Sequence, residues 1–569
     1  MKKKFSITLF AFLSISFLFS QVVNDSQLLK SDNWIYSAME TLALDSQTPV
    51  FFDTRPMSVG EIKYCLSQFD YEKLSESGKI LYQQVQKYLN TTKYLGKNSQ
   101  LGMFPDDSIT RLSVGLNLNP EFYARTNKNI PTTINYFYKD WSFTLPAIFG
   151  ISDYVTIQFD YFRGKNYESS RDPDAYTNYP LEDKESEYEY PRFAYGNASA
   201  VFDKWGFSAT IGKEGYSIGE TKLGSIIYNS TFETDAYSVL SAYAPNFKYN
   251  LIFSQVDYKK FLYFHNFNFK FFDNLKIGFT EGCLRNGPIE LRFLNPAMIL
   301  HSFYSAYTYA EDTQEKYNLG NHYCSYMGIT VDYYPIENLR LYALWAQTEM
   351  QLKGELNSSH GKMLPDGYGL QAGIDFTLPA RDVGFFDFNI EGIYTTPYLY
   401  VKQSPEWSMI KFRKDVKHSD DVISWLGTPY GPDAIVLTVN GKYTEAQNFS
   451  VGIENLFAMK GEVDGNTLLT TDVSKYESTG QLYPSYYPSV AHSLGQLSES
   501  EAISKARDKS LSGIIQYRND IIISGEYYFS PKIRASAEGI YTLIFNNNHK
   551  ENDFQQGFEL KLSLGIQLL

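Results

Sequence analysis

From about residue 110 to the last residue, apolar and polar residues alternate along the chain, and this alternation limits the fold more than any other feature. In residues 558–568 every second residue is apolar, and the same pattern returns in residues 112–118, 155–161, 368–378 and 533–543. A strand with this period presents one set of side chains on each face of a sheet. The segments are about 9–12 residues long, which is the length that a tilted strand needs to cross a bilayer. The alternation therefore predicts strands with one face toward lipid and the other toward a polar lumen.

The aromatic content favours a membrane barrel over an array of soluble β-sandwiches. Tyr, Phe and Trp number 47, 41 and 6, together 17% of the 569 residues, and many rings lie near the ends of the alternating segments, as in an aromatic girdle. Because lipid cannot satisfy an open sheet edge, such strands close on themselves. The sequence therefore predicts an all-β, transmembrane, antiparallel barrel of about 18 strands, with 16 as the close alternative. A mean hydropathy of −0.32 excludes a bundle of membrane helices.

The first 100 residues differ in character from the rest. Residues 1–20 have lysines at positions 2–4, continue with an apolar stretch and end in a small residue, which is typical of a secretory signal peptide. Apolar residues at helical spacing in 28–44 and 74–89, and the capping-box pair Ser58 and Glu61, predict a small helical bundle. The predicted organisation is a signal peptide (1–20), a periplasmic helical segment (21–100) and a barrel (101–569) in the outer membrane of a Gram-negative-type bacterium.

The charge and the motif content exclude several classes of function. A net charge of −13 argues against nucleic acid as a partner, since phosphate binding needs clustered lysine and arginine. The sequence has no His-Glu-x-x-His, Gly-x-Ser-x-Gly or Walker motif, so we expect no catalytic residues and no enzyme. The spacing of Cys65, Cys283 and Cys324 fits no zinc pattern, so neither a metal nor a cofactor is expected. Whether two of these cysteines form a disulfide stays open.

Three long stretches between predicted strands are candidate external loops: 163–191, about 400–433 and about 460–512. They combine rings with polar groups, as sugar recognition requires, because the C–H faces of a pyranose stack on aromatic rings. The candidate ligand-binding residues are Tyr176, Tyr188, Trp407, Arg413, Trp425, Tyr483, Tyr486 and Tyr487. A helix is expected over 497–507. The alternative is that these rings close the top of the barrel or belong to the girdle.

Charged residues in the first half of the barrel form a second candidate set. Within or beside strand-like segments lie Lys213, Glu214, Glu281, Arg285, Glu290 and Arg292. We predict that they face the lumen, where they form a network of ion pairs that stiffens the wall or line an aqueous path.

Two stretches resemble the Wzi-type capsule-assembly proteins of the outer membrane. These are residues 211–219, continuing to 247–249, and residues 278–282, followed by 290–296 and His301. The layout is also similar to that family, with a signal peptide, a helical segment containing Arg55-Pro56 and a barrel of about 18 strands. Lys213 and Ile218 stand where Arg and Trp are expected in the family. The motif resemblance covers about 205–302 and none of the long loops, so no binding residue is carried over.

The resemblance implies a non-catalytic, lectin-like role in which external loops hold capsular or other surface polysaccharide on the cell. Implied partners are the polysaccharide, outer-membrane lipid and, through the helical segment, the periplasmic export machinery. The alternative is a diffusion porin or a sugar-specific channel, because a polar lumen lined by rings also passes sugars. An outer-membrane hydrolase is a third reading. A TonB-type importer is disfavoured because residues 22–95 are predicted to be helical and not a β-rich plug.

Overall fold

The computed structural model describes most of the chain. The described residues are 25–91, 110–130, 142–165, 177–179, 186–187, 194–213, 215–232, 236–296, 323–351, 353–380, 383–414, 421–446, 448–463 and 487–567. The predicted signal peptide therefore lies outside the described residues.

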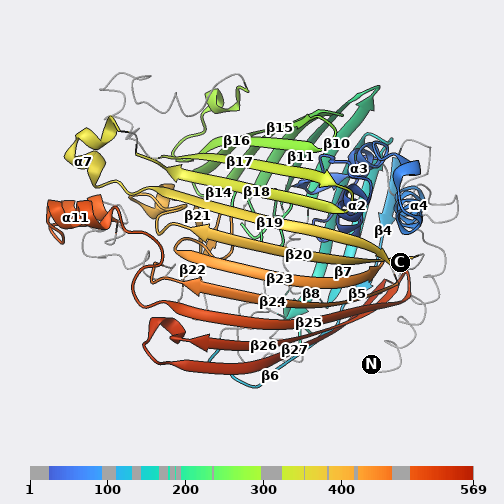
Figure 1. Cartoon of the computed structure of the whole chain (residues 1–569). Coiled ribbons are helices and arrows are strands. Elements are labelled where there is room, and N and C mark those ends of the chain that lie inside the picture. The colour runs from blue at the N-terminus through green and yellow to red at the C-terminus, as the bar shows by residue number, and fades with distance from the viewer. Residues whose placement is uncertain are drawn as a thin grey trace, which may run out of the picture.

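One antiparallel sheet closes on itself and forms the wall of a barrel with 18 strands (Figure 1). Its strands are β4 (Thr110–Val114), β5 (Asn117–Leu118), β6 (Glu121–Arg125), β7 (Phe143–Ile151), β8 (Val155–Lys165), β10 (Ala194–Phe202), β11 (Trp205–Lys213), β13 (Ala236–Ala244), β14 (Phe247–Asp257), β15 (Lys260–Phe271), β16 (Leu275–Asn286), β17 (Tyr323–Ile336), β18 (Leu339–Glu349), β19 (Gly367–Ala380), β20 (Gly384–Thr395), β23 (Ala434–Glu445), β24 (Phe449–Lys460), β25 (Gln516–Ser530), β26 (Ile533–Phe545) and β27 (Phe554–Gln567). A short segment, β9 (Ser186–Glu187), extends β8.

The first strand of the wall is interrupted. Its first part, β4 and β5, pairs with β7, and its second part, β5 and β6, pairs with the last strand, β27. These three segments together count as one strand, and the pairing of β5 and β6 with β27 closes the barrel. The prediction of 18 strands is confirmed, and the alternative of 16 is wrong.

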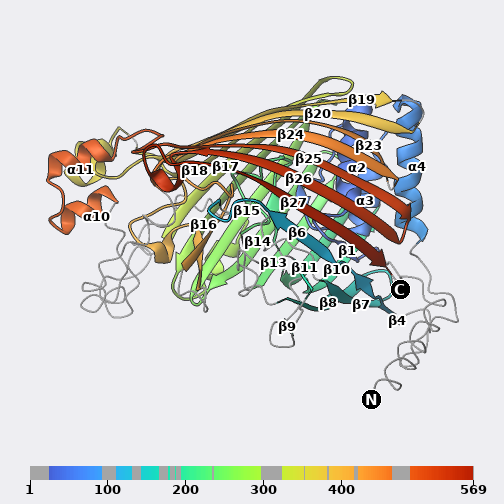
Figure 2. The same ribbon diagram turned by 90° about the horizontal axis from the view of Figure 1, so that it is seen from below.

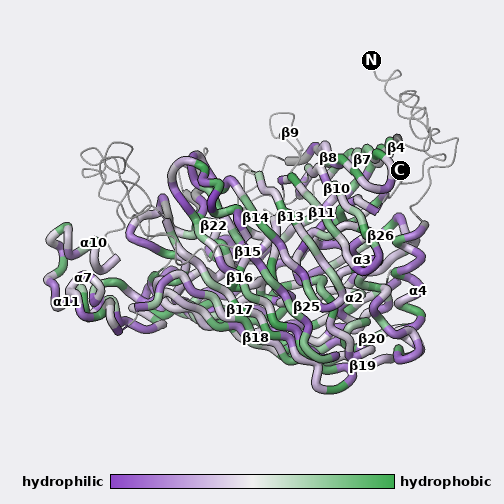
Figure 3. The backbone as a smooth tube through the Cα atoms, turned by 90° about the horizontal axis from the view of Figure 1, so that it is seen from above, coloured by the Kyte–Doolittle hydropathy of each residue, from purple (hydrophilic) through white to green (hydrophobic). Residues whose placement is uncertain are grey.

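The strands alternate as predicted. In β19, Leu370, Ile374 and Leu378 are between 42% and 50% exposed on the outer face, whereas Gln371 and Thr377 are buried in the lumen. Hydrophobic and hydrophilic residues alternate along the wall (Figure 3). An apolar outer face and a polar interior are what a bilayer demands of a barrel, so the fold is a transmembrane β-barrel. Among the described helices, none is long and apolar enough to cross a membrane.

The N-terminal segment, residues 25–91, plugs one end of the barrel, and we also call it the stopper. It contains β1 (Leu28–Leu29), α2 (Trp34–Asp45), β2 (Thr54–Arg55), β3 (Met57–Ser58), α3 (Val59–Leu66), η1 (Tyr71–Lys73) and α4 (Glu76–Thr91). The residues Ile35, Leu42, Ile62 and Val85 are fully buried between the helices, as their helical spacing predicts.

Two local details of this segment differ from the prediction. The expected first helix starts only at Trp34, because Leu28–Leu29 pairs as a strand with Met57–Ser58. Ser58 caps α3 as predicted, accepting a hydrogen bond from the Glu61 N–H at 3.2 Å. The Glu61 carboxylate, however, lies 2.6 Å from Lys248 Nζ of β14. It therefore pairs with the barrel wall instead of completing the predicted capping box.

The two ends of the barrel differ (Figures 1 and 2). At the helical end, which carries the N-terminal segment, strands are joined by two or three residues, such as 203–204 and 272–274. At the opposite, loop end, most connections are long and carry η4 (Leu291–Leu294), η7 (Glu355–Asn357), α7 (Ser359–Lys362), η8 (Pro405–Trp407), β21 (Ile410–Lys414), β22 (Asp421–Trp425), α10 (Pro488–Ser493), α11 (Glu499–Lys505) and η9 (Asn547–His549). The helix expected over 497–507 is α11. Cys65, Cys283 and Cys324 are buried free thiols.

Candidate functional site

The connection between β11 and β13 fills the centre of the lumen. Residues 215–232, which we call the inner segment, run inside the barrel and include β12 (Ser217–Ile218), which pairs with β2 of the N-terminal segment. Ile226, Ile227 and Tyr228 are fully buried. The Tyr326 hydroxyl of β17 donates to the carbonyl oxygens of Ile226 and Ile227 at 3.0 and 2.7 Å. The wall therefore satisfies the backbone of this segment, as a buried irregular chain requires.

A second connection also folds inward. Among the described residues of 396–433, between β20 and β23, Leu399, Tyr400 and Leu426 are fully buried. The Asn229 N–H of the inner segment donates to the Leu426 carbonyl at 2.9 Å, so the two inward stretches are joined. Lys260 Nζ holds the second stretch to the wall by donating to the Pro405 and Ile410 carbonyls at 3.0 and 2.5 Å. The middle of the barrel is thus filled by the chain itself.

A buried ion cluster joins the wall, the inner segment and the N-terminal segment. Lys276 Nζ of β16 lies 2.9 Å from Glu220, 3.4 Å from Asp332 and 3.7 Å from Asp53. These four side chains are at most 6% exposed. Arg340 of β18 binds the same Asp332 carboxylate and donates to the Glu220 carbonyl at 3.0 Å. Asp53 comes from the N-terminal segment and Glu220 from the inner segment, so the cluster fixes both within the barrel.

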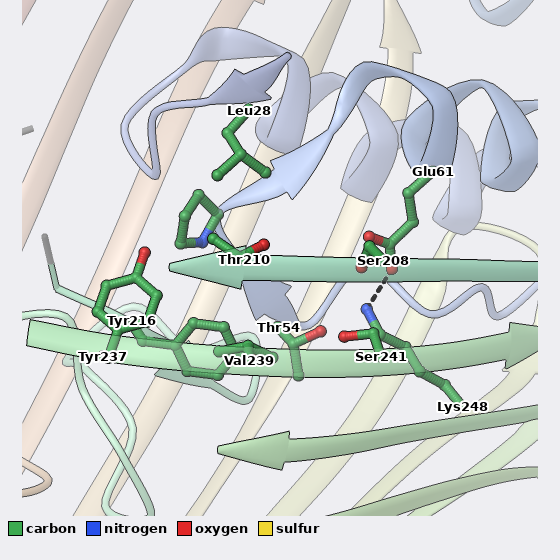
Figure 4. A pocket seen from close by; sticks show the side chains of 11 residues that line it. Leu28, Thr54, Glu61, Ser208, Thr210, Tyr216, Tyr237, Val239, Ser241 and Lys248 are labelled. Atoms are coloured by element: carbon green, nitrogen blue, oxygen red, sulfur yellow. Dashed lines mark ion pairs between the residues drawn. The ribbon is translucent and has the colours of Figure 1, made fainter. Parts of the chain in front are cut away.

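The stopper makes further charged contacts inside the barrel mouth, among them the two described next and a pair between Lys30 and Asp160 of β8. Glu61 of α3 meets Lys248 of β14 above strands β11 and β13, as the dashed line in Figure 4 marks. Glu40 of α2 lies 2.5 Å from Arg55 and 3.3 Å from Lys222 of the inner segment. Burial by itself raises the pKa of the Glu40 carboxyl, but Lys222 and Arg55 together outweigh burial and lower this pKa to about 2.

The Glu40 contact makes the stability of the protein depend on pH. A carboxyl whose pKa falls from 4.5 to about 2 on folding stabilises the fold above its ordinary pKa and loses this contribution as pH falls toward 2. We expect Glu40→Gln to unfold at a lower urea concentration than the wild type at pH 7. The difference should shrink below pH 4.5 and vanish near pH 2. Urea unfolding at several pH values, followed by tryptophan fluorescence, measures this; a difference independent of pH would contradict the assignment.

At the loop end, three connections pack into one platform, formed by the described residues of 350–366, 396–433 and 487–514. Arg507 lies 3.3 Å from Asp366 and so links the third connection to the first. The rings of Tyr398 and Tyr487 meet edge to face with centroids 5.8 Å apart, which links the second to the third. Glu499, Ser500 and Asp508 of the platform are exposed. Several loops thus present one joint surface.

The structure corrects two of the predicted ligand-binding residues. Trp425 and Tyr487 are 8% and 0% exposed, so both rings hold the loops together and neither is open to a polymer. The backbones of Trp407 and Arg413 belong to η8 and β21, but their side chains lie outside the described part of the chain. The remaining candidates, Tyr176, Tyr188, Tyr483 and Tyr486, also lie outside the described residues.

The predicted lumen network is misplaced. Residues 275–286 alternate, and Lys276 faces the lumen, so Glu281, Cys283 and Arg285 face outward. Arg285 and Arg292 do form ion pairs with Glu290, but on the outer wall, where 287–296 folds back over β15 and β16. Lys213 also points outward and is exposed, and Glu214 lies outside the described residues.

The charged residues that do face the lumen could have been identified from the sequence. Lys276, Asp332 and Arg340 each stand at alternate positions from the apolar, lipid-facing residues of their strands. Counting alternate positions within each strand would have assigned Lys276 and Glu281 to opposite faces. The inner segment and the fold-back of 287–296 were missed because neither has a local periodic signal. Within the described ranges, no group of three or more His, Cys, Asp and Glu side chains is arranged to hold a metal.

The fold defines a transmembrane β-barrel whose middle holds segments of its own chain. Wzi of Escherichia coli, described as an outer-membrane protein involved in group 1 capsule assembly and a carbohydrate-binding β-barrel, has a similar structure. Its TM-score is 0.55 at 11% identity, over 95% of this chain and 99% of that one. The resemblance inferred from the sequence therefore holds for the fold.

Two other outer-membrane barrels are less similar. OprD of Pseudomonas aeruginosa has a TM-score of 0.38 at 9% identity, over 80% of this chain and 96% of that one. OmpT of Vibrio cholerae has a TM-score of 0.31 at 10% identity, over 82% and 99%. Both likenesses are too loose to carry an argument. No protein-family model matches the chain, and no curated protein matches it in sequence.

Proposed function

We propose that this protein is a non-catalytic outer-membrane barrel that holds surface or capsular polysaccharide on the cell through its loop end. The filled lumen carries the proposal. The inner segment and the buried residues 398–401, 409–410 and 425–426 occupy the middle of the barrel. The loops are therefore better suited to bind a polymer than the lumen is to conduct one. The likeness to Wzi, a carbohydrate-binding barrel, agrees with this.

The lengths of the connections set the proposed orientation. Turns of two or three residues are typical of the periplasmic side of such barrels, and long loops of the outside. The helical end then lies in the periplasm and the platform on the cell surface, with lipid around the wall. The outward side of α4, where Gln83, Gln86 and Lys87 are exposed, would be available to export machinery.

Retention of the polysaccharide tests the function. We expect deletion of the gene to shift surface polysaccharide from the cell-attached to the released fraction, and the wild-type gene to restore it. Replacing residues 488–509, which carry α10 and α11, by a Gly/Ser linker of equal length should fail to restore attachment, because it removes one of the three parts of the platform. The measurement is the ratio of attached to released polymer.

A matched control is Tyr258→Ala, which removes a ring that is 77% exposed at the same end of the barrel but outside the platform. This variant should restore attachment fully. Equal ratios in the deletion strain and its parent would overturn the proposed function. A linker variant that is folded in the membrane and restores attachment would move the binding surface away from the platform.

A further inference from the structure

The stopper leaves part of the barrel mouth unfilled. A cavity of about 610 Å³ lies between α2 and the ends of β20, β23, β24, β25 and β26. A deeper cavity of about 190 Å³ shares part of its lining with the first. The shared lining includes Ser37, Glu40, Lys222, Asp387 and Lys442. Together they form a recess that leads from the helical end toward the buried ion cluster.

The floor of this recess is polar and hydrogen-bonded to the wall. Arg340 lies 2.8 Å from Asp375, and both line the deeper cavity. Asn389, which is 3% exposed and also lines it, donates to Asp375 at 2.7 Å. The Asn389 Oδ1 atom accepts no hydrogen bond from any described residue. A buried amide oxygen without a donor is costly, so a bound hydroxyl group would satisfy it.

The walls hold polar side chains that still have hydrogen-bonding capacity for a ligand. Lys442 makes no hydrogen bond or ion pair with any described residue, and its side chain is exposed to both cavities. Asp387, opposite in charge, receives one hydrogen bond, at 2.6 Å from the Thr377 hydroxyl. Half-buried Trp34 and Tyr528 bring rings to the outer cavity. Rings, cations, carboxylates and hydroxyls thus all line the space.

We propose that this recess binds a short saccharide segment at the helical end of the barrel, separately from the platform. The inference rests on the proposed function only for the identity of the polymer. A volume of 610 Å³ falls in the usual range for small-molecule sites. Sugar hydroxyls both donate and accept hydrogen bonds, which suits a lining that holds both carboxylates and cations, and the C–H faces of a sugar suit rings. A lipid chain would leave these charges unsolvated, so a lipid does not fit.

Binding of defined oligosaccharides tests this site. The probe is a fluorescently labelled set of short oligosaccharides made by partial hydrolysis of the strain's own surface polysaccharide. Titration into the full-length protein in detergent gives the affinity. We expect Lys442→Gln and Asp387→Asn each to weaken binding about tenfold, because each removes a charged partner of the ligand. Lys532→Gln is the matched control, since Lys532 is exposed at the same end outside the recess, and it should bind as the wild type does.

Thiol protection locates the ligand independently of those variants. Ser37 lines both cavities and is exposed, so Ser37→Cys should react with a maleimide, and the oligosaccharides should slow this reaction. Ser67→Cys, on the exposed C-terminal end of α3 outside the recess, should react at the same rate with and without them. The three native cysteines are buried and serve as an internal background.

The outcomes separate this site from the proposed function. Weakened oligosaccharide binding in both recess variants, with protection at Ser37→Cys, supports the recess whether or not cells retain polymer through the platform. Unchanged binding in the variants, or no protection, overturns the recess even if the platform variant loses attachment. If the wild-type protein binds no oligosaccharide, the recess is overturned, and polymer retention decides the proposed function alone.

Discussion

Replacing residues 215–234 by a short Gly-rich turn is expected to convert a silent barrel into a conducting one. Gly212 of β11 already pairs with Tyr237 of β13, so a short turn can join the two strands without moving them. The replacement removes Ile226, Ile227 and Tyr228 from the centre of the lumen. With that filling gone, the recess at the helical end would extend past the buried ion cluster, and water and ions could follow it.

Single-channel recordings in planar bilayers measure this. The wild-type protein should give no stable open steps, and the replaced variant should give frequent steps. The linker variant of residues 488–509 is the control, because it alters the loop end and keeps the inner segment, so it should stay silent. Stable conductance of the wild type would overturn the closed barrel and favour the alternative of a porin or sugar channel.

The second large effect is expected at the buried ion cluster. Lys276→Met removes the cation that Glu220, Asp332 and Asp53 share. These three side chains are at most 6% exposed; Asp332 and Glu220 keep Arg340 nearby, whereas Asp53 loses its cation. Breaking a buried pair from one side costs about 3–5 kcal/mol, since the remaining charge loses both water and partner. We therefore expect a fall of this size in the free energy of unfolding, measured by urea titration in lipid vesicles.

Lys30→Met is the matched control. Lys30 pairs with Asp160, whose side chain is 10% exposed, but the Lys30 side chain is 43% exposed, so water reaches the pair and its removal should cost clearly less than the removal of Lys276. The double variant Lys276→Met, Glu220→Leu should recover part of the loss, because it also removes one of the stranded charges. Equal effects of Lys276→Met and Lys30→Met would show that the cluster does not fix the stopper and the inner segment.

The wall of the barrel could be predicted from the sequence alone. Alternation in the strands, such as that around Leu370 and Ile374, is enforced by lipid on one side and polar groups on the other, so it can be read residue by residue. The helix that begins after Ser58 (α3) could likewise be predicted, and so could the helix within 497–507 (α11), because caps and helical spacing are local signals.

Which connections lie inside the barrel and which lie against its outer wall could not be predicted, because it depends on tertiary contacts. Residues 215–232 and 287–296 are both irregular connections, yet one folds into the lumen and the other over the wall. Their placement depends on partners distant in sequence, such as Glu220 with Lys276 and Asp53 with the same lysine. Tyr487 is buried for the same reason, since its partner Tyr398 comes from another loop. Pairings of this kind follow from the closing of the barrel, which brings distant segments together, and no local pattern records them.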